Sequence, residues 1–223
     1  MKSRKNLLEQ LKNLPYFSKD TVHQLGSQLG LKDTTVDTYI SRFLKYKEIL
    51  KLRRELYISA DFYNKNKADI SYPFYLANII RKPSYVSSWT ALQYYNLTTE
   101  SIHGITSVTQ KPTRTYDTKI GSFSYRSIQK ELFTDFSSVE GKFNFFIASS
   151  AKALFDLLYF KTHQFRGVQF KDINKLIEEM RINIEEMPKK DRVAFYTMIK
   201  KYLNHEWTDS RHTKKKTWRP RYI

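Results

Sequence analysis

The stretch LGLKDTTVDTYISRFLKYKEILKLRRELYIS, residues 29–59, carries the side chains with the most evident chemical use. At helical spacing Val36, Ile40 and Phe43 share one apolar face, and the opposite face carries hydroxyl and basic side chains. Hydroxyls exchange hydrogen bonds with base edges, whereas Arg and Lys bind phosphate oxygens. We therefore predict a DNA-binding surface formed by Lys32, Thr34, Thr35, Thr38, Ser41, Arg42 and Lys45, with Arg53 and Arg54 farther along the chain. The alternative is a helix face that contacts only water.

A second group of basic residues, Lys111, Arg114 and Arg126, lies among strand-like segments. Aromatic residues accompany it, namely Tyr116, Phe123 and Tyr125. Aromatic side chains stack on unpaired RNA bases, so this region is a candidate RNA-binding surface. Dense aromatics beside Ile and Leu, as at Tyr94, Tyr95, Phe143, Phe145 and Phe146, are more typical of a hydrophobic core. The sequence leaves both interpretations open for the basic region.

Catalytic and metal-binding patterns are weak. Ser149-Ser150-Ala151-Lys152 reads S-x-x-K, but the S-D-N and K-T-G motifs that accompany it in β-lactamase-type sites are missing. We expect a helix cap and a solvated lysine there. The five histidines, His23, His103, His163, His205 and His212, are far apart in the sequence. We predict no enzyme activity, no metal and no cofactor, and we place His23 on the exposed side of its helix.

The composition favours a nucleic-acid partner. Among 223 residues, 39 Lys and Arg stand against 22 Asp and Glu, a formal net charge of +17. Such an excess suits an acidic partner, because like charges otherwise oppose the compact state. The chain has no cysteine, which removes disulfides and thiolate chemistry. Its most apolar run, residues 143–160, includes charged residues and is too short to span a bilayer. We expect a cytoplasmic protein without membrane contact.

Residues 1–60 have the pattern of a winged helix-turn-helix, a DNA-binding domain. A first helix is predicted over residues 3–13. Ser18 is the expected N-cap of a second helix, which Gly30 ends in the left-handed conformation. Asp33 is the expected N-cap of the third, recognition helix, which runs to about Lys47. Alternating apolar residues on both sides of the sequence RRE at 53–55 predict a hairpin, the wing.

A larger α+β domain is predicted at 73–204, after a polar, aperiodic linker at 61–72. Helical patterns occur at 73–81, 87–96, 149–160, 171–182 and 189–204, and strand patterns at 105–109, 113–117, 122–128 and 143–147. We expect a small, mainly antiparallel sheet followed by C-terminal helices. Residues 205–223 are predicted to be a basic, aromatic tail.

Several short segments of the second domain, taken in order, resemble one protein family. They are PSYVS at 83–87, ALQYYNL at 91–97, ITSVT at 105–109, KPTR at 111–114, GSFSYR at 121–126 and ELF at 131–133. KALFDLLY at 152–159 resembles a later segment of the same family. The family is that of the AbiEi antitoxins of bacterial abortive-infection, type IV toxin–antitoxin systems. With the N-terminal winged helix, the resemblance extends to about residue 200.

The resemblance implies two activities. The winged helix would repress the toxin–antitoxin operon at inverted repeats in its promoter, which requires at least two monomers per operator. The second domain would neutralise a nucleotidyltransferase toxin without forming a stable complex with it. Many such winged helices have glycine where this chain has Lys47-Glu48 and Arg53-Arg54-Glu55. The alternatives are an RNA-binding module that shields the toxin's RNA substrate, and a plain winged-helix regulator with a sensing domain.

Overall fold

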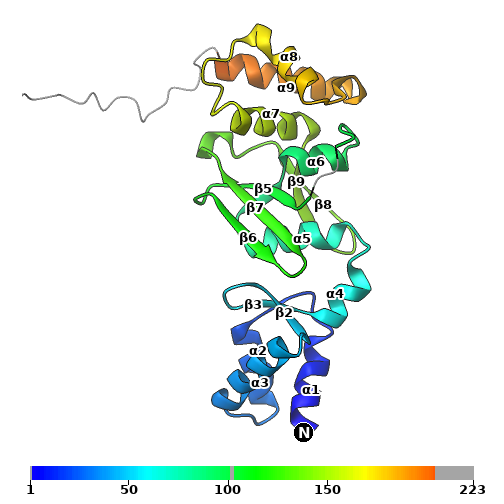
Figure 1. Ribbon diagram of the computed structural model, residues 1–223, viewed down its shortest axis with the longest axis vertical. Helices are drawn as coiled ribbons and strands as arrows, with labels where there is room; N and C mark the ends of the chain where they lie inside the picture. Colours follow the sequence, from blue (N-terminus) through cyan, green and yellow to red (C-terminus); the bar gives the residue numbers. More distant parts are fainter. Residues whose placement is uncertain (1, 101–102, 204–223) are drawn as a thin grey trace, which may run out of the picture.

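The computed structural model describes residues 2–100 and 103–203 as a mixed α+β protein. Figure 1 shows the N-terminal helices at one end of the molecule, a six-stranded sheet in the middle and helices α7 to α9 at the opposite end. The predicted fold class, α+β, is confirmed. The tail at 205–223, with His205 and His212, lies outside the described residues.

The N-terminal part combines three helices with a small antiparallel sheet. The helices are α1 (Lys2–Leu11), α2 (Lys19–Gln28) and α3 (Asp33–Lys45), and the strands are β1 (Phe17–Ser18), β2 (Ile49–Arg53) and β3 (Leu56–Ser59). The strand order is β1-β3-β2. A buried apolar cluster that includes Leu7, Leu11, Val22, Val36 and Phe43 holds these elements together. The predicted order of three helices followed by a hairpin is therefore present.

Two of the three predicted helix ends are confirmed. Ser18 is the N-cap of α2 and forms a capping box with Thr21, and Gly30 has a φ of +69° just after that helix. Asp33 as an N-cap is wrong, because Lys32 occupies that position and makes no side-chain cap. The carboxylate of Asp33 instead contacts His23 on α2. Helix α3 therefore has no side-chain cap, and the Asp33 side chain instead joins α3 to α2.

Residues in the left-handed conformation precede the hairpin and form its turn. Lys47, between α3 and β2, has a φ of 57°, and Glu55, in the turn, has a φ of 58°. Glycine is favoured in this conformation because it lacks a Cβ. Both residues lie in the segments, Lys47-Glu48 and Arg53-Arg54-Glu55, where many winged helices have glycine. Here residues with side chains adopt the left-handed conformation.

The segment expected to be an aperiodic linker contains a helix. Residues Ala60–Asn66 form α4, with Ser59 as the N-cap, and α5 begins at Ser71 and ends at Ile80. Phe62 and Tyr63 on α4 pack against the larger core. The prediction of an aperiodic linker was wrong because it considered the polar composition and not these two aromatic side chains. That core also includes Leu52, Leu56 and Ile58 from the hairpin. The N-terminal sheet is thus covered by its helices on one face and by the second core on the other.

The six-stranded sheet is mixed and larger than expected, although three of its five strand pairs are antiparallel, in line with the predicted mainly antiparallel pairing. Its strands are β4 (Ser84–Val86), β5 (Ile105–Thr109), β6 (Arg114–Thr118), β7 (Gly121–Ser127), β8 (Phe136–Val139) and β9 (Phe145–Ala148), in the order β6-β7-β5-β4-β9-β8. The pairs β4/β9 and β5/β7 are parallel, whereas the other three are antiparallel. The patterns predict neither β4 nor β8. The three residues of β4 are all buried, so no alternation marks that strand.

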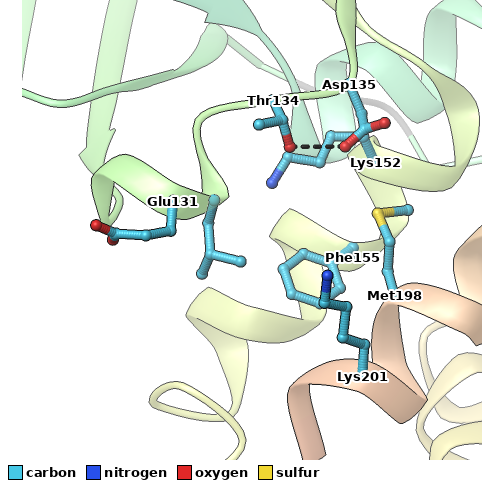
Figure 2. Close-up of a pocket in the computed structure, with 8 residues that line it drawn as sticks. Glu131, Thr134, Asp135, Lys152, Phe155, Met198 and Lys201 are labelled. Carbon is cyan, nitrogen blue, oxygen red and sulfur yellow. Dashed lines mark hydrogen bonds between the residues drawn. The ribbon is translucent and has the colours of Figure 1, made fainter. Parts of the chain in front are cut away.

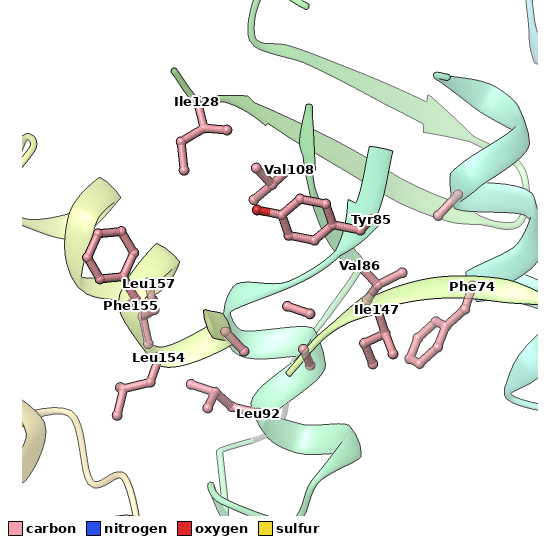
Figure 3. Packing of buried hydrophobic residues seen from close by; sticks show 14 of the residues in the cluster. Phe74, Tyr85, Val86, Leu92, Val108, Ile128, Ile147, Leu154, Phe155 and Leu157 are labelled. Atoms are coloured by element: carbon pink, nitrogen blue, oxygen red, sulfur yellow. The ribbon is translucent and has the colours of Figure 1, made fainter. Parts of the chain in front are cut away.

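Helices cover both faces of this sheet (Figure 1). Helix α5 packs on one face of the sheet. Helices α6 (Ser88–Tyr94) and α7 (Ser150–Lys161) pack on the other face. Figure 3 shows the core between α7 and the sheet, which includes Tyr85 and Val108 of the sheet and Leu154, Phe155 and Leu157 of α7. Beyond α7 lie α8 (Ile173–Glu179), shorter than expected, and α9 (Lys189–Leu203). Three short 3-10 turns, Lys130–Leu132, Phe170–Asp172 and Ile184–Glu186, complete the described elements.

Most of the aromatic residues named above belong to the core. Phe123, Tyr125, Phe143 and Phe145 are buried, and Tyr94, Tyr95 and Tyr116 are half-buried against them. Phe146 is the exception, since it is 46% exposed. A core role is therefore confirmed for the buried rings, which leaves few aromatic faces for stacking on bases.

Candidate nucleic-acid interface

The residues predicted to contact DNA form an exposed strip along α3. Lys32, Thr34, Thr38, Ser41, Arg42 and Lys45 are exposed, and Thr35 is half-buried. The buried stripe of Val36, Ile40 and Phe43 fixes this orientation, because it faces the N-terminal core. Within the described residues Arg42 and Lys45 make no ion pair with an acidic side chain. Both cations are therefore free to bind an external anion.

Two of the four hydroxyl groups of this strip already donate hydrogen bonds within the helix. Thr38 Oγ1 donates to the Thr34 carbonyl oxygen at 2.9 Å, and Ser41 Oγ donates to that of Asp37 at 3.0 Å. Such bonds to the preceding helical turn leave the oxygen lone pairs directed outward. In this conformation the two hydroxyls offer acceptors. They match the amino groups of adenine and cytosine in the major groove.

The acidic residues of α3 are held on the side of α2 by His23. Its Nδ1 is 2.8 Å from Asp33 Oδ1, and its Nε2 is 2.9 Å from Asp37 Oδ1. Lys19 Nζ also lies 2.9 Å from Asp37 Oδ1. We call this group of four residues the His23 clamp. The prediction of an exposed His23 is wrong, since its side chain is only 21% exposed.

The clamp requires a protonated imidazole. Both ring nitrogens face carboxylates, and only imidazolium donates from both. The hydrogen bond to Asp33, followed by that to Asp37, raises the pKa of His23, although partial burial opposes this. Hydrogen bonds from Lys19 and then from His23 lower the pKa of Asp37. The clamp joins α3 to α2 and places positive charge beside the two carboxylates of α3.

The clamp predicts a pH-dependent stability. A histidine whose pKa rises on folding stabilises the fold fully below its unfolded value, near 6.5, and this contribution is lost as the pH rises through the folded pKa. We expect wild type to have a higher free energy of unfolding than His23→Gln. In mild acid the difference between the two proteins should not change with pH. The difference should shrink above neutral pH. Chemical denaturation over a series of pH values measures it.

A matched control is His103→Gln, because His103 is exposed and makes no ion pair within the described residues. This substitution removes no ion pair, so it should change the free energy of unfolding little. The resonances of the His23 imidazole, followed by NMR, report its pKa directly. Titration at or below 6.5 would contradict the clamp.

The predicted wing residues Arg53 and Arg54 are both exposed at the hairpin turn. Arg53 Nη1 donates to the Arg54 carbonyl oxygen at 3.1 Å. The Arg54 side chain is 89% exposed and lies 3.6 Å from Glu55, so this exposed ion pair contributes little to stability. Two arginines are thus presented at the end of the hairpin.

The second predicted basic surface is divided between two faces of the sheet. Arg114 pairs with Tyr125 across β6 and β7, so Arg126, the next residue, points to the opposite face. Arg114 lies over the Tyr116 ring at 5.1 Å, whereas Arg126 lies over the Phe160 ring of α7 at 5.3 Å. Lys111 is exposed in the loop before β6. These three residues therefore do not form one surface.

The lysine expected to be solvated is in the protein interior. Lys152 is 1% exposed, and its Nζ lies 2.6 Å from Oδ1 of Asp156, which is fully buried. Asp156 Oδ2 also accepts hydrogen bonds from the hydroxyls of Ser87, at 2.7 Å, and Tyr85, at 3.0 Å. Burial raises the pKa of the Asp156 carboxyl, and the Lys152 ammonium is the strongest opposing influence. No sequence pattern indicates that Asp156, Ser87 and Tyr85 lie together beside Lys152.

The S-x-x-K segment does not form a catalytic pair. Ser149 caps α7 by accepting a hydrogen bond from the Lys152 amide at 3.2 Å, which confirms the predicted cap. Ser150 Oγ donates to Asp191 on α9 at 2.5 Å. Each hydroxyl is therefore occupied by a structural contact, and the Lys152 ammonium is paired with Asp156.

A pocket of about 340 Å³ lies beside Lys152. Figure 2 shows the Lys152 side chain between Thr134 and Phe155, with Met198 and Lys201 of α9 on another side. Most of the lining surface is apolar, and Glu131 and Asp135 add acidic groups. Such a space suits a small amphipathic molecule.

Other classes of site find no support in residues 2–100 and 103–203. No cluster of three or more His, Cys, Asp or Glu residues there is placed to hold a metal ion. None of the helices in that part of the chain has both the length and the apolar character that a membrane crossing requires.

No protein-family model matches the chain, and no curated protein is detectably similar to it in sequence. The resemblance to the AbiEi antitoxins therefore depends on the short segments themselves.

Proposed function

We propose that residues 1–60 form a winged helix-turn-helix and that the protein binds promoter DNA through it as a repressor of its own operon. The order of α1, α2, α3 and the β2–β3 hairpin supports this proposal. In this arrangement α3 enters the major groove. Arg42, Lys45 and Lys32 bind phosphates, and Thr34, Thr35, Thr38 and Ser41 contact base edges. Arg53 and Arg54 bind the backbone or the minor groove beside it.

The observation that carries the proposal is the separation of charge on α3. Its exposed strip ends in Arg42 and Lys45, without acidic partners in the described residues. Its acidic residues, Asp33 and Asp37, are instead bound by His23 and Lys19. A helix that only faced water would not need this arrangement. Inverted repeats in the promoter would bind at least two copies of the protein.

The Arg42 contact predicts a specific loss of affinity. We expect Arg42→Ala to weaken binding to a duplex taken from upstream of the gene about tenfold at fixed salt, because one charge-assisted hydrogen bond to phosphate is lost. Fluorescence anisotropy with the full chain measures this. Arg166→Ala is the matched control. Arg166 is exposed and lies beyond α7, and its substitution removes the same charge as Arg42→Ala does. Equal affinities of the two variants would contradict the docking of α3.

The second part of the proposal is antitoxin activity, which the family resemblance supports. The protein would neutralise a nucleotidyltransferase toxin encoded next to it, without a stable complex. The test is growth rescue: the adjoining gene is induced while the full chain, as wild type or Arg42→Ala, is supplied from a separate promoter. Rescue of growth by both wild type and Arg42→Ala would mean that neutralisation depends on surfaces other than α3. Failure of rescue by wild type would refute the antitoxin role while leaving the repressor proposal intact.

One observation favours a second candidate, a regulator whose larger domain senses a small molecule. The pocket beside Lys152 is large enough for such a ligand, and a buried ion pair lies at its wall. This candidate predicts no toxin gene beside the regulator. The RNA-shielding alternative has less support, because Arg114 and Arg126 point to opposite faces of the sheet.

A further inference from the structure

The wing and the six-stranded sheet lie against each other. Strand β2 of the hairpin contacts β6, which is the edge strand of the larger sheet. Leu52, Leu56 and Ile58 belong to the same buried cluster as the core of that sheet. The Tyr72 hydroxyl donates to the Pro15 carbonyl oxygen at 2.6 Å and joins α5 to the N-terminal part. These contacts hold the edge of β6 at a fixed place beside the hairpin.

Three arginines lie near this junction: Arg53 ends β2, Arg81 follows α5 and Arg114 begins β6. Arg114 of β6 lies over the Tyr116 ring at 5.1 Å. Arg81, just after α5, donates to the Tyr116 hydroxyl at 3.2 Å and to the Pro112 carbonyl oxygen at 2.5 Å. Burial raises the pKa of Tyr125, and the positive charges of Arg81 and Arg53 lie near enough to oppose that rise. We call Arg53, Arg81 and Arg114 the junction arginines.

The junction arginines have no acidic partner. Within residues 2–100 and 103–203 none of the three makes an ion pair. Asp117 pairs with Ser122 and so points to the face of β6 opposite Arg114. The Arg81 Nε is buried and makes no hydrogen bond. Neighbouring cations without a counter-charge repel one another, so an external anion at this place lowers their energy.

We propose that the DNA bound by α3 and the hairpin continues along the junction arginines, so that the second domain also holds the phosphate backbone. This inference rests on the proposed DNA-binding function. Arg114 is the contact residue, because it is exposed and its guanidinium lies over the Tyr116 ring. Arg81 is a positioning residue, because its guanidinium is bonded to Tyr116 and to the loop at Pro112.

Duplex DNA is favoured over single-stranded RNA by the form of this surface. The cluster adjoins the exposed arginines of the hairpin, so it prolongs a track suited to a continuous backbone. The rings beside it are used within the protein: Tyr116 carries Arg114, and Tyr125 is buried with its hydroxyl bonded to the Ala77 carbonyl oxygen at 2.6 Å. Stacking platforms for unpaired bases are therefore missing at these rings.

The test compares Arg114→Gln with Arg126→Gln in the full chain. Both substitutions remove one exposed arginine from neighbouring positions of the same sheet, but only Arg114 faces the junction. The probe is a fluorescein-labelled DNA duplex of scrambled sequence, because phosphate contacts do not depend on sequence. We expect Arg114→Gln to weaken binding and to reduce the slope of log affinity against log salt by about 0.9. Arg126→Gln should leave both quantities unchanged.

Two further variants separate charge from folding. Arg114→Lys keeps the charge and should retain most of the slope, whereas Arg114→Glu should weaken binding more than Arg114→Gln. All variants should share the thermal unfolding midpoint of wild type.

The salt slopes of Arg114→Gln and Arg126→Gln decide the inference. If they are equal while Arg42→Ala still binds the duplex more weakly than wild type, this inference alone is overturned. Absence of duplex binding by wild type would overturn it together with the proposed function. Loss of RNA binding without loss of duplex binding would also overturn it.

Discussion

Replacing Lys152 by methionine is expected to lower the free energy of unfolding by about 3–5 kcal/mol. Methionine has a similar length, so it fills the space of the lysine side chain. It leaves Asp156, which is fully buried, without its cationic partner. Ser87 and Tyr85 still donate to the carboxylate, but two neutral hydrogen bonds do not replace a paired charge. Chemical denaturation followed by tryptophan fluorescence measures the loss.

The chain provides a matched control on another helix. Lys175 and Glu179 also form an i,i+4 pair, but they are exposed and 3.9 Å apart, so Lys175→Met should change stability by less than about 0.5 kcal/mol. Adding Asp156→Asn to Lys152→Met removes the unpaired charge and should recover part of the loss. A loss below about 1 kcal/mol for Lys152→Met alone would show that Asp156 does not depend on this lysine.

The second large effect is expected at Gly26, where α2 contacts Val36 of α3. A Cβ at this position would lie 2.4 Å from Cγ2 of Val36, so Gly26→Ala requires Val36 or its helix to shift. Overpacking of this kind costs about 1–3 kcal/mol, and the better helix propensity of alanine offsets it by at most about 1 kcal/mol. Because Val36 lies on α3, we expect Gly26→Ala to weaken both folding and duplex binding.

Gly141→Ala serves as the control, since a Cβ there meets no atom within 4 Å. It should leave stability and DNA affinity close to those of wild type. In the Gly26→Ala background, Val36→Ala removes the methyl group that clashes. The combined variant should therefore bind DNA better than Gly26→Ala alone. Additive losses in the two variants would contradict the close contact, because residues that touch are expected to be coupled.

The N-terminal elements could be predicted from the sequence because their signals are local. Ser18 with Thr21, Gly30 and the alternation around the turn at 53–55 each act within a few residues. The apolar stripe of Val36, Ile40 and Phe43 also gave the correct outer face of α3. The contact between His23 and Asp33 could not be predicted, because it joins residues on two helices.

The errors in the second domain have a similar cause. Pairing of β4 with β9 joins strands more than fifty residues apart, so no local pattern indicates it. For Lys152 a signal did exist: α7 is apolar on all sides, and such helices are buried completely. Any charged residue on that helix must then be paired, as Lys152 and Asp156 are. The i,i+4 spacing alone does not distinguish this pair from the exposed pair of Lys175 and Glu179.

The shared core affects how the two parts should be studied. A cut after residue 60 would expose Leu52, Leu56 and Ile58, which are buried against the second domain. It would also separate the Tyr72 hydroxyl from the Pro15 carbonyl oxygen. Substitutions in the full chain therefore test DNA binding and neutralisation more cleanly than separated fragments.

The measurement that tests the central claim most directly is the affinity of the full chain for a duplex from upstream of its gene, determined over a range of salt concentrations. Neutralisation of about six phosphates predicts a slope of log affinity against log salt of about −5. A slope near this value would support binding through the basic strip of α3 and the hairpin. A slope close to zero would contradict the account, because the exposed cations would then not be binding DNA.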